Sequence, residues 1–596
     1  MKNNRLIIII VCLSLVVSLL CGCTGGSVTP TTTTTTTKVD IQDSLGNVDT
    51  DIDDNDKNSD YDQTGAKKIT FSGDSASVKG TGVAAQGSTV RISADGTYVV
   101  SGASNDGYII IEASKAEVKL VLNGVNLTHT DGPAILVKNA KKVTFTIADG
   151  TNNVLSDGSS YSLYEGNAVV DGAIFAKADL VFNGNGTLTV NGNNAHGIVS
   201  KDALTITGGN IIVNSKNAGI YGKDFLKIVD ANVTIKAGTD GLKADNIDDA
   251  SAGYIYIQSG IFNINSANDA IQSSSVVSID NGTFNIKTTS TLSTASAKGV
   301  KGVTGVAISG GTFVIDAADD GIHSDGDVLV AGGNISIKSA DDGVHANDNL
   351  EITGGELVIE KSYEGLEATD IAISNGKVII NATDDGMNAS GGNDENTTTG
   401  GRPGDMFEST TGSITISGGY VIVHAEGDGV DANGTLTISG GVVLVDGPSR
   451  GGNGSLDYNS TASISGGVFI ALGTSDMAQN FKDATQGSIL TTNSSSFSAG
   501  TVISVCDANG NVIVAFRSTK TFNCVTVSAP ELKQGETYTF YKNASVSGLD
   551  ENGFAHNTTQ SGGTSWQTVT LSSLISGQGS SMPGGGGGFP GGTRPR

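Results

Sequence analysis

The sequence predicts an all-β chain that folds as a right-handed parallel β-helix, a solenoid with about 22 residues and three strands in each coil. A glycine preceded by an acidic residue returns at this period, as at Gly321, Gly343 and Gly365. A fixed period between about 20 and 50 residues is typical of stacked repeats. Within each repeat, short segments alternate Val or Ile with polar residues and are separated by Gly, Asn and Asp, which favours β-strands.

The N-terminus has the features of a bacterial export signal, which we place at residues 1–23. Lys2 and Arg5 precede an apolar run from Leu6 to Leu20, and this run is shorter than a typical membrane-spanning helix. The four residues that end at Cys23 resemble a lipobox, which would make Cys23 the lipidated first residue of the mature chain. An uncleaved anchor is the alternative. In both cases we expect an exported protein tethered to the outer face of the cell membrane.

The rest of the chain divides by composition and by regularity of the repeat. Residues 24–65 are rich in Thr and Asp and predict a disordered linker. Residues 66–196 continue the repeat less regularly, as N-terminal coils and a cap, and residues 197–473 carry the regular coils. Residues 474–576 lose the repeat and predict β-hairpins that cap the other end. The Gly-rich residues 577–596 predict a disordered tail.

Charge restricts the choice of partner. A formal net charge of −26 argues against nucleic acid, because that binding depends on cations that contact phosphates. A polyanionic partner would need bridging metal ions. We expect a monomer. Cys506 and Cys524 lie on segments that we expect to be neighbouring strands, and export permits a disulfide; a disulfide and two buried free thiols are both left open.

The acidic residues fall into columns when the repeats are stacked on the recurring glycine. The residues one and three places after the glycine are apolar or small and must point inward, so the residue two places after it points outward. The position before the glycine holds Asp240, Asp269, Lys298, Asp320, Asp342, Glu364, Asp385 and Asp428. The outward position holds Lys243, Gln272, Lys301, His323, His345, Glu367, Asn388 and Asp431.

Stacked carboxylates about 5 Å apart repel one another by several kcal/mol at an effective dielectric constant near 20. Clusters of oxygen ligands of this kind suit Ca²⁺, which takes about six to eight oxygens in flexible geometry. For any single Asp, capping of a turn before glycine is the simpler interpretation, but it does not explain the acids at the outward position. The candidate calcium ligands are Asp320, Asp342, Glu364, Glu367, Asp384, Asp385, Asn388, Asp428 and Asp431.

Two histidines and two arginines are candidate ligand-binding residues. His323 and His345 occupy the outward position in adjacent coils, where they predict either a transition-metal site or a solvated, stacked ladder. Arg402 lies in the longest insertion, between Ala389 and Thr411, which we interpret either as a substrate lip or as a disordered excursion. Arg450 is the other candidate.

Several short segments of the sequence resemble those of a known family. Between about Lys67 and Gly473, the runs Ile69 to Gly73, Tyr98 to Gly102 and Val121 to Val125, with the Asp-Asp-Gly repeats, resemble the clostridial carbohydrate-binding β-helix family. This resemblance implies a cell-surface β-helix that holds calcium and binds plant cell-wall polysaccharide, especially pectic acid and cellulose.

The enzymes that this family resembles are the family 9 pectate lyases, in which an Asp-Asp-Gly-apolar-Asp motif holds calcium and a lysine on the same face abstracts a proton. In the run Asp384 to Asn388, Asn388 replaces the last Asp of this motif. In the run Gly427 to Asp431, Gly427 replaces the first Asp of the motif. No lysine occurs from Val378 to Phe481. These departures place the proton-abstracting base in doubt.

Three functions are consistent with the sequence. We favour a non-catalytic protein in which calcium bridges Asp320, Asp342, Glu364, Asp385 and Asp428 to the uronate carboxylates of an acidic plant cell-wall polysaccharide. The second is a polysaccharide lyase that acts by β-elimination, with Lys243 or Lys301 as the base. The third is a structural surface protein or adhesin.

Overall fold

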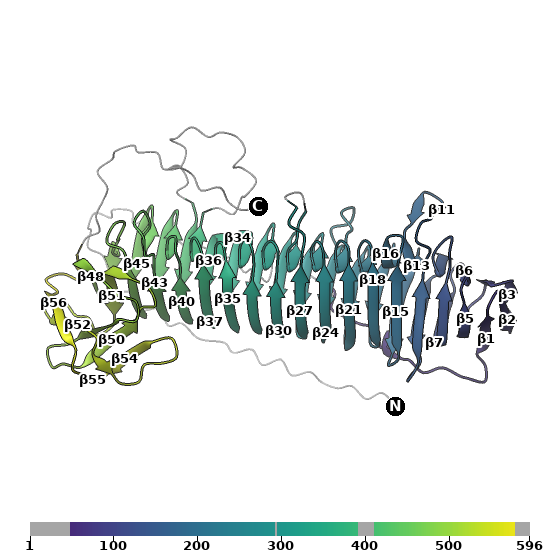
Figure 1. Ribbon diagram of the computed structural model, residues 1–596, viewed down its shortest axis with the longest axis horizontal. Coiled ribbons are helices and arrows are strands. Elements are labelled where there is room, and N and C mark those ends of the chain that lie inside the picture. Colours follow the sequence, from purple (N-terminus) through teal and green to yellow (C-terminus); the bar gives the residue numbers. More distant parts are fainter. Residues whose placement is uncertain (1–47, 293–294, 391–410, 578–596) are drawn as a thin grey trace, which may run out of the picture. The chain divides into compact units, whose positions relative to one another are not determined.

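The computed structural model describes residues 48–292, 295–390 and 411–577. Cys23, Arg402, the predicted signal peptide and the tail after residue 577 lie outside the described residues. Within the described ranges the chain is all-β apart from the short helix α2 (Asp54–Lys57), as the sequence predicts (Figure 1). No helix in these ranges is both long and apolar enough to cross a membrane.

Parallel strand pairing organises most of the chain. Among the described residues, one hydrogen-bonded sheet contains 48 strands, and from β6 onward most strands pair in parallel with the strand three places further along the chain. The strands therefore form three series, and Figure 1 shows those of the third series side by side in a row. The three series, in chain order, are as follows.

The first series contains β6 (Tyr108–Glu112), β8 (Ile135–Asn139), β13 (Gly172–Ala176), β16 (His196–Ser200), β19 (Ile220–Gly222), β22 (Leu242–Ala244), β25 (Ile271–Ser273), β28 (Val300–Gly302), β31 (Ile322–Ser324), β38 (Met387–Ala389), β41 (Val430–Ala432) and β44 (Asp457–Tyr458). The second contains β9 (Lys142–Ile147), β14 (Asp179–Gly184), β17 (Ala203–Ile206), β20 (Phe225–Ile228), β23 (Tyr254–Ile257), β26 (Val276–Ile279), β29 (Gly305–Ile308), β32 (Asp327–Val330), β39 (Ser413–Ile416), β42 (Thr435–Ile438), β45 (Thr461–Ile464) and β47 (Asp483–Ala484). Two long strands, β34 (Val344–Ile352) and β36 (Leu366–Ile373), belong to both series. The third contains β10 (Asn152–Ser156), β15 (Thr187–Gly192), β18 (Asn210–Ser215), β21 (Ala231–Ala237), β24 (Gly260–Ser266), β27 (Thr283–Thr288), β30 (Thr312–Asp316), β33 (Asn334–Lys338), β35 (Glu356–Ser362), β37 (Lys377–Ala382), β40 (Tyr420–His424), β43 (Val442–Asp446) and β46 (Val468–Gly473).

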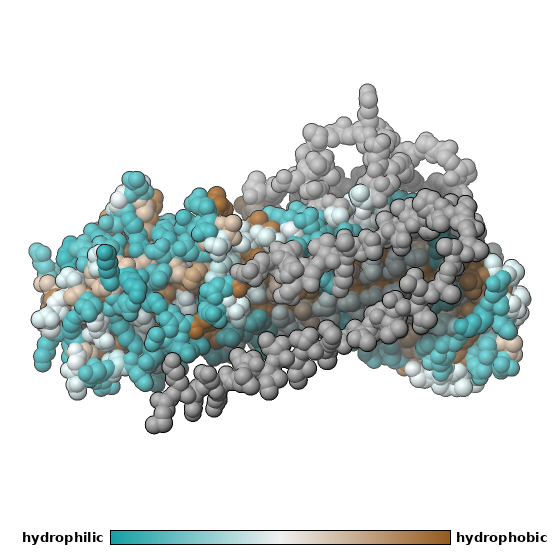
Figure 2. All heavy atoms as spheres, turned by 180° about the vertical axis from the view of Figure 1, so that it is seen from behind, coloured by the Kyte–Doolittle hydropathy of each residue, from teal (hydrophilic) through white to brown (hydrophobic). Residues whose placement is uncertain are grey.

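The register of this pairing places like residues on like and builds one continuous core. Leu226, Ile255 and Val277 are in register on successive strands of the second series, and all three are fully buried. In the third series the rings of Phe262 and Phe284 stack with centroids 4.7 Å apart. In the view of Figure 2, most residues on the uncovered surface are hydrophilic, and hydrophobic residues are visible between them in bands and small groups.

The two ends of the sheet depart from this pattern. At the N-terminal end β1 (Lys67–Ser72) pairs with β2 (Ser75–Lys79), and β3 (Val83–Gln86) pairs with β4 (Thr89–Ile92), both antiparallel. β5 (Gly96–Ser104) and β7 (Glu117–Thr128) lead into the three series. A separate hairpin, β11 (Leu163–Glu165) and β12 (Ala168–Val170), interrupts the first repeats.

After Gly473, most strand pairs are antiparallel. β51 (Phe522–Ala529) pairs antiparallel with both β46 and β48 (Gly487–Phe497), whereas β57 (Ile575–Ser576) pairs parallel with β48. A five-stranded sheet follows, and Cys506 and Cys524 are buried free thiols in separate apolar clusters. The five strands are β49 (Val502–Cys506), β50 (Val512–Arg517), β52 (Thr537–Lys542), β54 (Phe554–Thr558) and β56 (Thr564–Thr570), beside the small pair β53 (Ser545–Val546) and β55 (Gln560–Ser561).

Residues 48–60, which we call the N-terminal strap, contact the outward side of the second series. Composition predicts no structure for residues 24–65, yet α2 and its flanks are held by side chains of the sheet. The ammonium of Lys142 lies 2.7 Å from the Asp56 carboxylate, and that of Lys227 lies 2.7 Å from Asp49. These contacts join residues far apart in sequence, so local composition does not predict them.

The recurring glycine is required by close approach between neighbouring repeats. A Cβ atom on Gly343 would lie 2.7 Å from the carbonyl oxygen of Gly365 and 2.5 Å from the side chain of Ile359. The amide of Gly343 also donates to the carbonyl of Glu364, so the backbone cannot move away without loss of that hydrogen bond. Glycine at this position therefore serves packing, which keeps the acids beside it in line.

We predict that Gly343→Ala lowers the free energy of unfolding by about 1–3 kcal/mol, because the added methyl group meets a backbone carbonyl. Denaturant unfolding measures the change. Val314→Ala is the control, because Val314 is 53% exposed and its truncation should change stability by no more than about 0.5 kcal/mol. Equal stability of Gly343→Ala and the unmodified protein would contradict this account of the glycine.

Candidate functional site

The first series carries one outward column along its length, which we call the outward column. Strand register aligns the outward residues of the repeats, and Ile322, beside His323 in β31, is fully buried while pointing inward. Asp457, which sequence analysis missed, continues the column. Its repeat has Ser455 where the others have glycine, so the period alone did not reveal it. The aligned residues are Lys243, Gln272, Lys301, His323, His345, Glu367, Asn388, Asp431 and Asp457.

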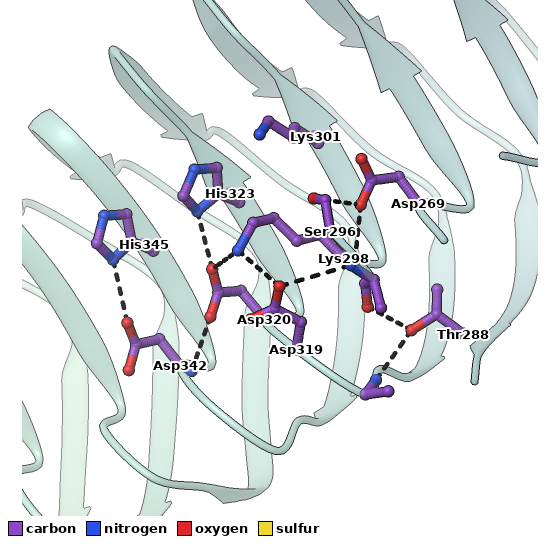
Figure 3. Close-up of polar contacts among 12 residues, drawn as sticks. Asp269, Thr288, Ser296, Lys298, Lys301, Asp319, Asp320, His323, Asp342 and His345 are labelled. Carbon is purple, nitrogen blue, oxygen red and sulfur yellow. Dashed lines mark hydrogen bonds and ion pairs between the residues drawn. The ribbon is translucent and has the colours of Figure 1, made fainter. Parts of the chain in front are cut away.

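In the middle of this face, basic side chains of the protein contact the acidic residues. The Lys298 ammonium lies 2.5 Å from Asp320 and 3.1 Å from Asp319, and His323 Nδ1 lies 2.8 Å from Asp320 (Figure 3). Burial alone would lower the pKa of Lys298, but the charges of Asp320 and Asp319 outweigh it and raise that pKa. Burial would likewise raise the pKa of Asp320, and Lys298 and His323 reverse this and lower it. Asp320 is therefore an ionised carboxylate with built-in counterions.

His345 contacts two further acids of this face, one repeat further along the chain. Its Nδ1 lies 3.0 Å from both Asp342 and Glu367, and its Nε2 lies 2.9 Å from the side-chain oxygen of Asn347. Burial opposes the charge on the ring, but the hydrogen bonds with Asp342 and Glu367 raise the pKa of His345 to about 12. Both ring nitrogens thus carry protons, and the ring stacks on His323 with centroids 4.8 Å apart.

The C-terminal part of the face has no such counterion. Asp385, Asp428 and Asp431 bring carboxylate oxygens within 4.8 Å of one another. Within the described ranges, none of the three forms an ion pair with Lys, Arg or His. Asp385 accepts a hydrogen bond of 2.5 Å from the amide of Asp428, and Asp428 accepts one from the amide of Gly454. These backbone contacts fix the carboxylates but leave their charges uncompensated.

The electrostatic consequence is a set of carboxyl groups that resist ionisation. Burial, followed by the charge of Asp428, raises the pKa of Asp385 to about 9. Burial raises the pKa of Asp428 to about 7 against a hydrogen bond from Gly454, and Asp457 adds to the rise. Burial and Asp457 raise the pKa of Asp431 to about 6. A bound cation would relieve this repulsion.

Asn388 adds a fourth oxygen group beside these acids. It is in register with Asp431, is only 8% exposed, and its side-chain oxygen is buried without a hydrogen-bond partner among the described residues. Its amide nitrogen donates to Glu364 at 2.8 Å, which fixes the orientation of the amide. Carboxylate and amide oxygens are the ligand types that hard divalent cations prefer, so these four residues are a candidate cation site.

Three other groups of potential ligands suit a metal less well. They are Asp320 with His323 and His345, Asp342 with His345 and Glu367, and Asp319 with Asp320 and Asp341. In the first two, the histidine nitrogens already bond to carboxylate or amide oxygens, whereas a metal needs a free nitrogen lone pair. In the third, Lys298 already supplies a positive charge.

The remaining predicted residues lie around this centre. Asp384 precedes Asp385, and its carbonyl accepts from the amide of Gly427. Arg450 is exposed. The Lys243 ammonium is paired with Asp240 at 3.1 Å and lies 3.6 Å from Asp245.

Lys301 lies well away from the C-terminal acids. Its ammonium is 3.9 Å from Asp325. Four strand steps of about 4.8 Å, or about 19 Å in total, separate Lys301 from Asn388. The two lysines considered as bases therefore stand apart from the uncompensated carboxylates.

A family model and a curated protein that match this chain carry the same description. A family model described as carbohydrate-binding domain-containing protein matches residues 86–343 and 340–510. A curated protein of the same description from Acetivibrio thermocellus is 39% identical over 151 residues, which are 25% of this chain and 53% of that protein. The chain thus spans about half the length of the curated relative that it matches.

A solved structure also matches part of the chain. It is the polysaccharide lyase-like protein from C. thermocellum, as a gadolinium derivative, at 33% identity. The match covers 42% of this chain and 94% of that chain, with a TM-score of 0.36.

We predict that, in a metal chelator, stability falls as pH rises. Carboxyl groups with a raised pKa in the folded state bind more protons there than in the unfolded chain, so ionisation between about pH 5 and pH 9 destabilises the fold. The unfolding free energy should fall by about 2 kcal/mol or more over this range, and Asp385→Asn should flatten the curve. Denaturant unfolding at each pH measures it.

Asp348→Asn is the control for this experiment, because Asp348 is exposed in the same sheet. Its profile should match that of the unmodified protein. A flat profile in chelator, or an Asp385→Asn profile with the original slope, would count against the repulsion described here.

Proposed function

The chain belongs to the carbohydrate-binding domain family, and from this premise we propose that it binds an acidic plant cell-wall polysaccharide through calcium, without cleaving it. Pectic acid is the main candidate ligand, with cellulose as a second. The single observation that carries this proposal is the cluster of Asp385, Asp428 and Asp431, which has no counterion among the described residues. A strongly acidic chain and a polyanionic ligand can associate when a metal ion bridges them.

We infer that the three strand series close into the right-handed parallel β-helix that the period of 22 residues predicts. Pairing of each strand with the third strand onward supports this, as do the stacks of identical inward residues. Such a scaffold keeps the outward column straight, so that an extended polymer would meet equivalent positions in successive repeats.

Calcium would be held by Asp385, Asp428, Asp431 and the side-chain oxygen of Asn388. Ca²⁺ takes about six to eight oxygens, so coordination positions would remain for the carboxylate and hydroxyl groups of a uronate. The bound ion supplies positive charge to an otherwise acidic face. The protein holds the ligands at fixed spacing through backbone hydrogen bonds to Asp385 and Asp428.

This proposal narrows the set of ligands suggested by the sequence. Asp320 and Asp342 are candidates by spacing, but Asp320 already contacts Lys298 and His323, and Asp342 already contacts His345. Glu364, Glu367 and Asp384 surround the proposed centre, and Glu364 orients the Asn388 amide. Lipidation at Cys23 would hold the protein at the outer face of the membrane, with polysaccharide as its partner there.

We predict calcium-dependent retention of polygalacturonate without product release. Asp385→Asn/Asp431→Asn should weaken retention at least about tenfold, equivalent to about 1.4 kcal/mol, because it removes two of the charged ligands. Binding is measured by affinity electrophoresis in calcium and in chelator. Asp316→Asn/Asp348→Asn, which makes the same charge change at exposed acids, should bind like the unmodified protein.

The same samples test the lyase alternative through the absorbance of unsaturated uronates. The expected result is no increase in absorbance, since Lys301 and Lys243 are remote from the proposed ion or already paired. Release of unsaturated oligouronides that is abolished in Lys301→Ala or Lys243→Ala would establish a lyase and overturn the non-catalytic proposal. Retention that is indifferent to calcium would remove the metal from the proposal.

A further inference from the structure

The N-terminal strap covers a row of basic and aromatic side chains on the second series. We call this row the lysine strip; it consists of Lys119, Lys142, Lys227, Phe225 and Tyr254. The register Lys119 to Thr144 to Val181 to Thr205 to Lys227 places Lys119 and Lys227 on one line, about 19 Å apart over four strand steps. This line belongs to a different strand series from the outward column, so the strip is separate from the proposed calcium centre.

Lys227 anchors one end of the contact. Its ammonium lies 2.7 Å from the Asp49 carboxylate and 2.8 Å from the Asp51 carbonyl. The Lys227 side chain is 4% exposed although it points outward, while Asp49 is 63% exposed. The ammonium also lies 4.8 Å from the centre of the Phe225 ring, which stacks on Tyr254 at 5.4 Å.

Polar contacts continue along the strap. Lys142 pairs with Asp56 at 2.7 Å, and the Lys119 ammonium donates to the carbonyls of Asn58 and Asp60 at 2.9 and 2.7 Å. Asn183 and Thr207 donate to the carbonyl of Asp56. Side chains of the sheet thus contribute the donors, and the strap contributes carboxylate and carbonyl oxygens.

Those oxygens are the groups that an acidic polysaccharide presents. A polyuronate carries carboxylates at regular intervals with hydroxyl oxygens between them, and its sugar faces can pack on aromatic rings. We propose that the lysine strip is a second, calcium-independent binding site for acidic polysaccharide, and that the strap occupies it as an intramolecular competitor. The ligand class rests on the proposed function, but the site does not use the calcium centre.

The strap suits this role because its contacts with the lysines of the strip are polar, while Val48 packs beside the strip on Val276, Ala307 and Leu329. Exchange of its carboxylates for those of a ligand leaves each lysine paired, so neither state leaves a buried charge uncompensated. Covalent attachment gives the strap a high effective concentration, so the strip is covered until the strap is weakened or ligand is abundant. Apparent affinity at the strip is then reduced by the fraction of molecules in which it is free.

The test weakens the strap in the full chain and measures binding without calcium. In chelator, Asp49→Asn/Asp56→Asn should bind polygalacturonate at least about fivefold more tightly than the unmodified protein, the lower end of typical coupling between sites. Added salt should weaken this binding. Further substitution of Lys142→Gln/Lys227→Gln should remove the gain, and a neutral polysaccharide should show none.

Asp54→Asn/Asp60→Asn is the matched control. It makes the same charge change within the strap, but the exposed Asp54 carboxylate pairs with Lys57, and the Lys119 ammonium donates to the Asp60 backbone carbonyl, which the substitution keeps. This variant should bind like the unmodified protein in chelator. A second variant, in which a Gly-Ser sequence of equal length replaces residues 48–60, removes every side chain of the strap.

The outcomes separate this proposal from the calcium proposal. If the Gly-Ser variant folds and binds no more polygalacturonate in chelator than the unmodified protein, the strap has only a structural role and the proposal is overturned. Tighter binding that survives Lys142→Gln/Lys227→Gln also overturns it. If the unmodified protein shows no calcium-dependent binding but the strap variants bind in chelator, the calcium proposal fails and the lysine strip stands.

Discussion

Parallel pairing between each strand and the third strand further along the chain places equivalent residues in contact about every 4.8 Å. For inward residues this repetition builds the core, because Phe262, Phe284 and Phe313 stack on one another as Ile and Val do elsewhere. For outward charged residues the same register is costly, since like charges are held side by side. The recurring glycine two residues before each outward residue allows neighbouring repeats to pack closely. It therefore maintains both the stacking of inward residues and the repulsion between outward charges.

The chain resolves this repulsion in two ways along one face. In the middle, Lys298 and the hydrogen bond of His323 compensate Asp320, and protonated His345 contacts Asp342 and Glu367. Burial still raises the pKa of Asp342, and its Oδ1 is buried without a hydrogen-bond partner among the described residues. Towards the C-terminus, Asp385, Asp428 and Asp431 have no protein counterion among the described residues, and their pKa values are raised. On the basis of this division we propose cation binding, and with it polysaccharide binding, at the C-terminal end of the column.

Periodicity predicted the parts that depend on local pattern. The all-β class and the alignment of residues from Lys243 to Asp431 follow from the recurring glycine and from alternation, and the structure has both. Asp457 was missed because serine replaces glycine in its repeat. The role of Lys298 as a counterion to Asp320 depends on side-chain geometry across two repeats. The pairing of Asp49 with Lys227 joins residues 178 positions apart, which no local signal encodes.

Calorimetric titration of calcium at pH 7, in two buffers that differ in ionisation enthalpy, tests the cation centre most directly. Asp385, with a pKa of about 9, holds a proton at this pH, so a calcium ion bound to its carboxylate must displace it. The account predicts saturable calcium binding with release of about one proton, and loss of both in Asp385→Asn. Absence of calcium binding, or binding and proton release unchanged in Asp385→Asn, would contradict it.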